Sequence, residues 1–76
     1  MTEHTFISRL EEEGCWVPPD WRYLSEHGEA LPVYLRRGMM LAHIYVTPEE
    51  VFRATEETVS AVVGRLRFEL SGATIH

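Results

Sequence analysis

The sequence of 76 residues has a single cysteine, Cys15, and this scarcity excludes two common ways of stabilising a small domain. One cysteine forms no internal disulfide, and no cysteine pair is present to begin a zinc knuckle. A chain of this size buries only about 60% of the surface that its unfolded form exposes. We therefore expect tight packing or self-association to supply the stability, in a reducing compartment, the cytoplasm.

Lysine, asparagine and glutamine are absent as well, so every cation is an arginine. The codon bias of a GC-rich genome explains this pattern, and so does a selection of arginine for planar, bidentate contacts. No run approaches the roughly 18 apolar residues of a membrane-spanning helix, and residues 1–13 lack the basic start and apolar stretch of a signal peptide. The formal net charge of −5 disfavours non-specific binding to phosphate backbones.

What the chain does contain is the apolar share of a folded domain, 45% of its residues. It has no internal repeat and no linker. We expect one small domain over residues 1–76, with flexible ends at 1–2 and 71–76.

The N-terminal segment predicts a short amphipathic helix over residues 2–13. Phe6, Ile7 and Leu10 follow the three-and-four spacing of one helical face, and the other face is charged. Gly14 ends the helix, since glycine readily adopts the left-handed conformation of a helix stop.

A rigid corner and a second helix are expected next. Residues 17–19, Val-Pro-Pro, are extended because proline donates no backbone hydrogen bond and biases its predecessor to an extended shape. Pro19 can open a helix that carries Trp21 and Leu24 on one face and closes at Gly28.

Residues 31–46 predict a β-hairpin. Apolar and polar positions alternate over 31–36, which is typical of a half-buried strand, and Arg37-Gly38 supplies a tight reversal. Gly38 can take the positive φ of a bulged hairpin turn. The second strand, 39–46, is apolar on both faces and needs cover on two sides. Its faces are Met40, Ala42, Ile44 and Val46 on one side and Met39, Leu41 and Tyr45 on the other.

A long amphipathic helix follows the hairpin. Thr47 caps its start, Pro48 is its first residue and Glu50 its third, which completes a capping box. Residues 65–70 either extend this helix, which we favour, or form a short third strand. The apolar stripe is Val51, Thr55, Val59, Val62 and Leu66, widened by Phe52 and Val63, and Phe68 falls outside it.

Together these elements define an α+β fold with two short N-terminal helices, a β-hairpin and a longer C-terminal amphipathic helix. A two-stranded sheet alone is marginal in water, and one long helix covers only one of its faces. Three ways of covering the other face stay open. They are the two N-terminal helices, a second copy of the chain paired along residues 39–46, and another protein.

The sequence shows no pattern that predicts catalysis or a cofactor. The candidate metal ligands are His4, His27, His43, His76 and Cys15, and they lack the spacing of a metal site. We interpret Cys15 as a small buried residue rather than a nucleophile. The glutamates at 11–13 and 56–57 lie on polar helix faces, where solvation is the default role. We expect a protein that is not an enzyme and binds neither a metal nor a cofactor.

The remaining unusual residues are of the types found at protein interfaces. Tryptophan, tyrosine, methionine and arginine are enriched in interface cores and hot spots. The candidate partner-binding residues are Trp16, Trp21, Tyr23, Tyr34, Arg36, Arg37, Met39 and Tyr45. We expect at least one of the two tryptophans to fill the core, which leaves the other for a contact surface.

These features favour a small acidic protein-binding module that acts, alone or as a homodimer, as an inhibitor or adaptor. It would dock on a larger protein complex, as small proteins carried by phages and mobile elements do, and its partner would present a basic surface. Neither nucleic acid nor a membrane is the expected partner. The alternative is a small winged-helix-like DNA-binding regulator with the turn at 36–38 as its wing, although the acidic helices argue against it.

Overall fold

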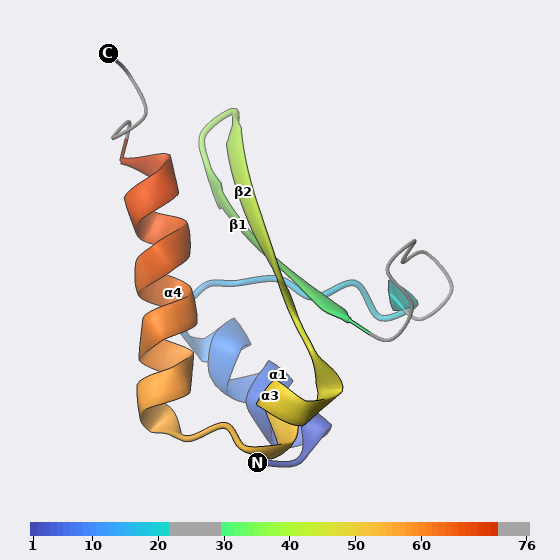
Figure 1. Ribbon diagram of the computed structural model, residues 1–76. Helices are drawn as coiled ribbons and strands as arrows, with labels where there is room; N and C mark the ends of the chain where they lie inside the picture. The colour runs from blue at the N-terminus through green and yellow to red at the C-terminus, as the bar shows by residue number, and fades with distance from the viewer. Residues whose placement is uncertain (22–29, 72–76) are drawn as a thin grey trace.

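The computed structural model describes residues 1–21 and 30–71, and it confirms the predicted α+β class (Figure 1). The elements in chain order are α1 (Glu3–Glu12), β1 (Leu31–Arg37), β2 (Met40–Val46), α3 (Pro48–Phe52) and α4 (Glu56–Leu70). The helix predicted over residues 19–28 lies mostly outside the described ranges. At the start of this range the chain makes a turn, in which the N–H of Trp21 donates to the carbonyl of Pro18 at 3.2 Å.

Helix α1 ends at a glycine as predicted. Gly14 has a φ of +93°, and its N–H donates to the carbonyl of Glu11 at 3.0 Å. The N–H of Cys15 donates to the carbonyl one residue further back, that of Leu10, also at 3.0 Å. This pair of bonds is a Schellman motif, which is stabilised by an apolar contact across the turn. Cys15 and Leu10, the two residues in position for that contact, are both buried.

The hairpin turn contains two residues, Gly38 and Met39. Strands β1 and β2 pair antiparallel in continuous register along their whole length. Gly38 has a φ of +62°, and no described residue other than glycine has a positive φ. A positive φ at the first turn residue is typical of the type II′ hairpin. The predicted bulge is therefore wrong, because neither strand holds an extra residue.

A third stretch of chain joins the sheet at Trp16. Its N–H donates to the carbonyl of Tyr34 at 2.8 Å, and the N–H of Tyr34 donates to the carbonyl of Trp16 at 2.9 Å. At Tyr34, the edge of β1 that points away from β2 is thus paired by the chain itself. Successive residues of a strand direct their backbone groups to opposite edges, so Pro32 faces this same edge. Its missing N–H therefore costs no bond to β2.

The single long helix expected after Thr47 is in fact two helices, α3 and α4. The predicted capping box is present at the first start, where the N–H of Thr47 donates to Glu50 Oε1 and the N–H of Glu50 donates to Thr47 Oγ1. A second start follows at Thr55, which is extended (φ −125°, ψ −179°) and donates its N–H to Thr58 Oγ1 at 3.0 Å. The Thr58 hydroxyl accepts the N–H of Thr55, which a continuous helix would instead bond to a carbonyl one turn back. This competition separates α3 from α4.

The break changes which side chains face the core. Val51 on α3 is buried, but Phe52, which was expected to widen the apolar stripe, is 80% exposed. Helix α4 continues to Leu70, which confirms that residues 65–70 are helical, and Phe68 is exposed as expected. The buried side chains of α4 are Val59, Val62, Val63, Leu66 and Leu70.

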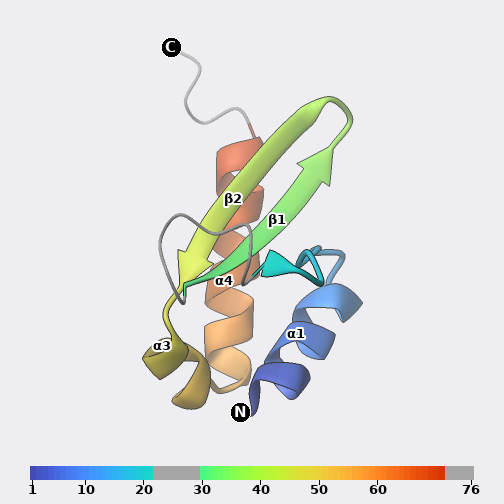
Figure 2. The same ribbon diagram turned by 90° about the vertical axis from the view of Figure 1, so that its right-hand side faces the viewer.

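The described helices all lie on one side of the hairpin or below it. Helix α4 runs along both strands, and α1 and α3 lie near its N-terminal end (Figures 1 and 2). We call the side of the sheet facing α4 the inner face. Its buried or partly buried side chains are Leu31, Val33, Leu35, Ala42, Ile44 and Val46, and the exposed Arg37 and Met40 continue this face at the turn. The core is completed by Phe6, Leu10, Cys15, Val17, Trp21, Val51, Ala54 and the α4 side chains. None of these described helices is long and apolar enough to cross a membrane.

An exposed ion pair joins α1 to α4. Arg9 Nε donates to Glu56 Oε2 at 2.8 Å, and a second guanidinium nitrogen donates to Glu56 Oε1. The same guanidinium bonds Glu12 Oε1 at 2.9 Å. The hydrogen bond from Arg9 lowers the pKa of Glu56. The pKa of Glu50 is lowered mainly by the hydrogen bond from the backbone N–H of Thr47 and further by the bond from the Thr47 hydroxyl.

We predict that Phe6→Ala lowers the free energy of unfolding by about 3–5 kcal/mol, because the ring is fully buried. Phe68→Ala is the matched control and should change it by about 0.5 kcal/mol or less, since Phe68 is 63% exposed. Urea unfolding followed by circular dichroism measures both. Equal losses from the two substitutions would contradict the placement of Phe6 in the core.

We also predict that acid removes part of the stability. A carboxylate with a depressed folded-state pKa stabilises the fold above its unfolded-state pKa, and this contribution is lost as pH falls through the folded-state value. The variant Glu50→Ala/Glu56→Ala should melt slightly below the native protein at about pH 7, and the gap should narrow towards about pH 3. Thermal unfolding of both proteins across this range measures the gap. A gap that stays constant with pH would be inconsistent with these bonds.

Candidate functional site

No described helix lies over the side of the sheet that faces away from α4, the outer face (Figure 2). Its exposed or partly exposed residues are Tyr34 and Arg36 from β1, Leu41, His43 and Tyr45 from β2, and Trp16 beside β1. The strand period of two puts these side chains opposite the buried ones. Leu41 is 60% exposed and Trp16 is 56% exposed.

Four rings form a continuous aromatic band across the outer face. The ring centroids of Trp16 and Tyr34 are 5.7 Å apart, those of Tyr34 and His43 are 5.9 Å apart, and those of His43 and Tyr45 are 5.6 Å apart. These spacings are those of favourable tilted and edge-to-face ring pairs. The backbone bonds between Trp16 and Tyr34 set the band, because they place the two rings side by side.

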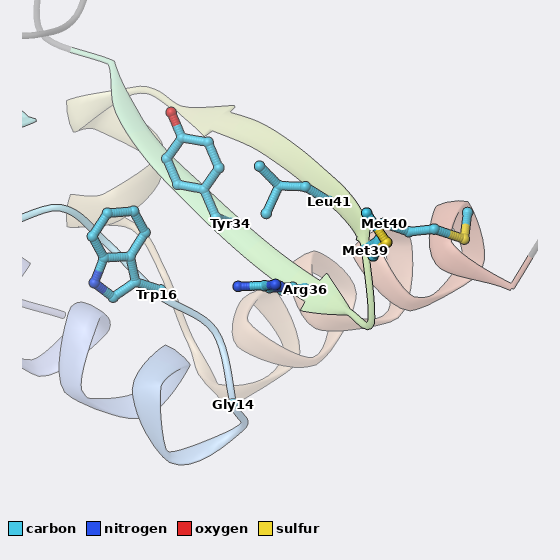
Figure 3. Close-up of a pocket in the computed structure, with 7 residues that line it drawn as sticks. All are labelled: Gly14, Trp16, Tyr34, Arg36, Met39, Met40 and Leu41. Atoms are coloured by element: carbon cyan, nitrogen blue, oxygen red, sulfur yellow. The ribbon is translucent and has the colours of Figure 1, made fainter.

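A groove of about 570 Å³ opens beside this band, towards the hairpin turn (Figure 3). It is lined by Gly14, Trp16, Tyr34, Arg36, Met39, Met40 and Leu41. Figure 3 shows Tyr34 and Arg36 rising from β1 between Trp16 on one side and Leu41 on the other. The walls are thus mainly apolar, with one cation and without an acidic residue, which suits an apolar ligand that carries a negative charge.

Arg36 is the polar group of the groove. Its Nε donates to the carbonyl of Gly38 at 2.7 Å, which anchors the base of the guanidinium at the turn. No carboxylate of the described residues forms an ion pair with it, whereas Arg9, Arg53, Arg65 and Arg67 all pair with glutamates. The remaining guanidinium nitrogens can bind a carboxylate of a partner.

The structure separates the eight candidate binding residues. Trp16, Tyr34, Arg36 and Met39 line the groove, and Tyr45 ends the aromatic band. Trp21 is 5% exposed and belongs to the core, so it is the tryptophan that the core was expected to take. Arg37 lies at the turn on the opposite side of β1 from Arg36. Tyr23 lies outside the described residues.

Four residues of this surface were not among the candidates. Leu41 could have been included, because the alternation in residues 39–46 already places it beside Tyr45. Met40 lines the groove through its position next to the turn. His43 joins the aromatic band through its pairing with Tyr34. Gly14 gave no sequence signal, because it reaches the groove only through the path of the chain after α1.

The sequence raises two further kinds of site for the described ranges, a metal site and a reactive thiol. No group of three or more histidine, cysteine, aspartate or glutamate side chains among those residues is arranged to hold a metal ion. The thiol of Cys15 is buried, and this burial raises its pKa, although Arg67 acts in the opposite direction.

Comparisons of the chain with known protein families, with curated proteins and with solved structures find no match.

We predict that Cys15 is unreactive in the folded protein, because a buried thiol with a raised pKa is rarely a thiolate. Labelling by an aromatic disulfide reagent near neutral pH should be at least about a hundredfold slower than in the urea-unfolded chain. Comparable rates in the two states would show that the thiol is accessible and would reopen a role for it as a nucleophile.

Proposed function

We propose that this chain is a non-enzymatic protein-binding module and that the groove on the outer face receives a segment of its partner. The observation that carries the proposal is the set of large apolar side chains exposed around a concave site with an arginine whose charge has no counterpart in the described residues. An inhibitor or adaptor that docks on a larger protein complex is the role that such a module serves.

Energetics support a binding role for the exposed side chains. A domain of this size needs its large apolar residues for the core, because so little of its surface is buried on folding. Trp16 and Leu41 nevertheless lie in the open, and Met39 is 99% exposed. Clustered tryptophan, methionine and arginine are the residues that dominate binding energy at interfaces. Desolvating them against a partner recovers the hydrophobic free energy that folding leaves unused.

The lining of the groove also suggests the chemistry of the partner. The net charge of −5 favours a basic partner, but most of the described acidic side chains lie on the helices, among them Glu12, Glu49 and Glu56, and none of them lines the groove. Arg36 is the charged group of the lining. We therefore propose that the segment entering the groove is apolar and carries a carboxylate, and that any basic surface of the partner meets the helices.

The single thiol, buried and without a disulfide partner, is compatible with a reducing compartment, and we place the protein in the cytoplasm. The winged-helix alternative has one supporting feature, the exposed Arg36 and Arg37 at the hairpin turn. Helix α4 begins with Glu56 and Glu57, which repel phosphate, and residues 19–28, where the sequence predicts the other candidate for a recognition helix, lie mostly outside the described residues.

We predict that a random peptide display library selected on the native protein yields sequences that combine an acidic residue with bulky apolar ones. The affinity of the best peptide should fall about tenfold or more with Trp16→Ala, which removes an apolar wall, and with Arg36→Glu, which reverses the charge. Calorimetric titration measures the affinities.

Phe52→Ser is the matched control, since Phe52 is another exposed aromatic residue, on α3 and outside the groove. It should leave the affinity unchanged. The proposal fails if selection yields no peptide, or if the selected peptides bind the Trp16→Ala protein as tightly as the native one.

A further inference from the structure

The outer edge of β2 is an available hydrogen-bonding surface. The mutual bonds of Trp16 and Tyr34 show that the backbone groups of Tyr34 point away from β2. The backbone N–H and C=O groups of successive strand residues point to opposite edges. The residues of β1 that bond β2 are therefore Val33, Leu35 and the other odd-numbered residues of the strand. The register pairs Tyr34 with His43 and Arg36 with Leu41. The N–H and C=O groups of His43 and Leu41 therefore point outward, away from the sheet, and neither residue has a backbone partner among the described ones.

The sequence of β2 lacks the features with which proteins protect open strands. Natural edges carry lysine or other charged residues, proline, a bulge or a covering element. Strand β2 reads MLAHIYV, and it contains no proline, no glycine, no bulge and no Asp, Glu, Lys or Arg. The opposite edge of the sheet is different, because Trp16 pairs with it at Tyr34 and Pro32 offers no N–H there. Within residues 1–21 and 30–71, the structure thus pairs part of one edge and leaves the other available.

The sequence of β2 is complementary to itself in one antiparallel register. A two-fold axis through Ala42 places Leu41 of each copy opposite His43 of the other copy. Each of these two pairs exchanges two backbone hydrogen bonds, so four bonds form from groups that have no partner among the described residues of the monomer. On the inner face Ala42 meets Ala42, small enough for close approach, and Met40 meets Ile44. No two like charges face each other in this register.

We infer that a second copy of this chain pairs along β2, centred on Ala42, and forms a four-stranded antiparallel sheet in the order β1-β2-β2-β1. The pairing covers apolar area that the monomer leaves in water, because Leu41 is 60% exposed and Met40 is 47% exposed. It also extends the sheet from two strands, which are marginally stable in water, to four strands, a number that is stable. The two outer faces become one surface, with a groove at each end. This dimer goes beyond the proposed function, since it uses the edge of the sheet and not the groove.

Sedimentation equilibrium of the native protein should give twice the chain mass of 8.8 kDa at micromolar to millimolar concentrations. The variant Leu41→Glu/His43→Glu puts glutamate opposite glutamate at both cross-pairs and should be a folded monomer, with the fold checked by circular dichroism. The variant Leu41→Glu/His43→Lys puts glutamate opposite lysine and should restore the dimer. A register centred on His43 would instead place like charges at position 43 in both variants.

His4→Glu/Thr5→Glu adds the same two carboxylates on exposed positions of α1 and should remain dimeric. A monomeric native protein overturns the inference, and so does a dimer that the double-glutamate variant leaves intact or that the α1 control also dissociates. Loss of the dimer in both variants, without rescue by lysine, overturns the Ala42-centred register. Trp16→Ala should leave the dimer intact, so that failure of peptide binding and failure of dimerisation are separate results.

Discussion

A two-stranded sheet has two faces and two edges, and the described part of this chain covers only some of them. Helix α4 covers the inner face, and the single residue Trp16 pairs with the edge of β1 at Tyr34. The described helices leave the outer face and the edge of β2 in contact with water. The groove and the unpaired strand are consequences of this incomplete cover. They are also the two places where another polypeptide gains most from binding.

The cover of the inner face depends in turn on where one helix ends and the next begins. Thr55 interrupts the segment after the hairpin, and the short α3 lets the chain leave β2 and reverse before α4 crosses back beneath both strands. A continuous helix from Pro48 would keep the direction that α3 has. The break also leaves Phe52 in solvent while Val51 and Ala54 enter the core. The change of chain direction between α3 and α4 therefore leaves the aromatic ring of Phe52 exposed, although a continuous helix could have buried it.

Among the described residues, charge is distributed so that the outer face of this acidic protein carries no acidic side chain. The described ion pairs lie on the helices, where Arg9, Arg53 and Arg65 each meet a glutamate. Arg36 is held instead by the turn carbonyl of Gly38, at the end of a groove without acids. The helical side and the outer face thus differ in sign, and they can contact different surfaces of one partner.

Much of the architecture follows from local sequence signals. The glycine stop after α1, the alternation of β1 and β2 and the capping box at Thr47 each depend on a few neighbouring residues, so the elements and the two faces of β2 were predictable. The second helix start was predictable in principle, since Thr55 and Thr58 have the spacing of a cap, but Thr55 also fits an apolar stripe. Local patterns of equal strength do not decide between such alternatives, because the choice depends on packing against the rest of the chain.

Some features of the candidate site follow from the sequence, and others follow from the tertiary structure. The sequence places tryptophan, tyrosine, methionine and arginine in or near a predicted hairpin, of which one long helix can cover only one face. That Trp21 enters the core and Trp16 lies beside Tyr34 follows from the tertiary structure, because burial depends on where distant segments meet. The same holds for the free edge of β2. Which edge of a hairpin stays open depends on a backbone contact between residues 16 and 34, and such a contact leaves no periodic pattern in either segment.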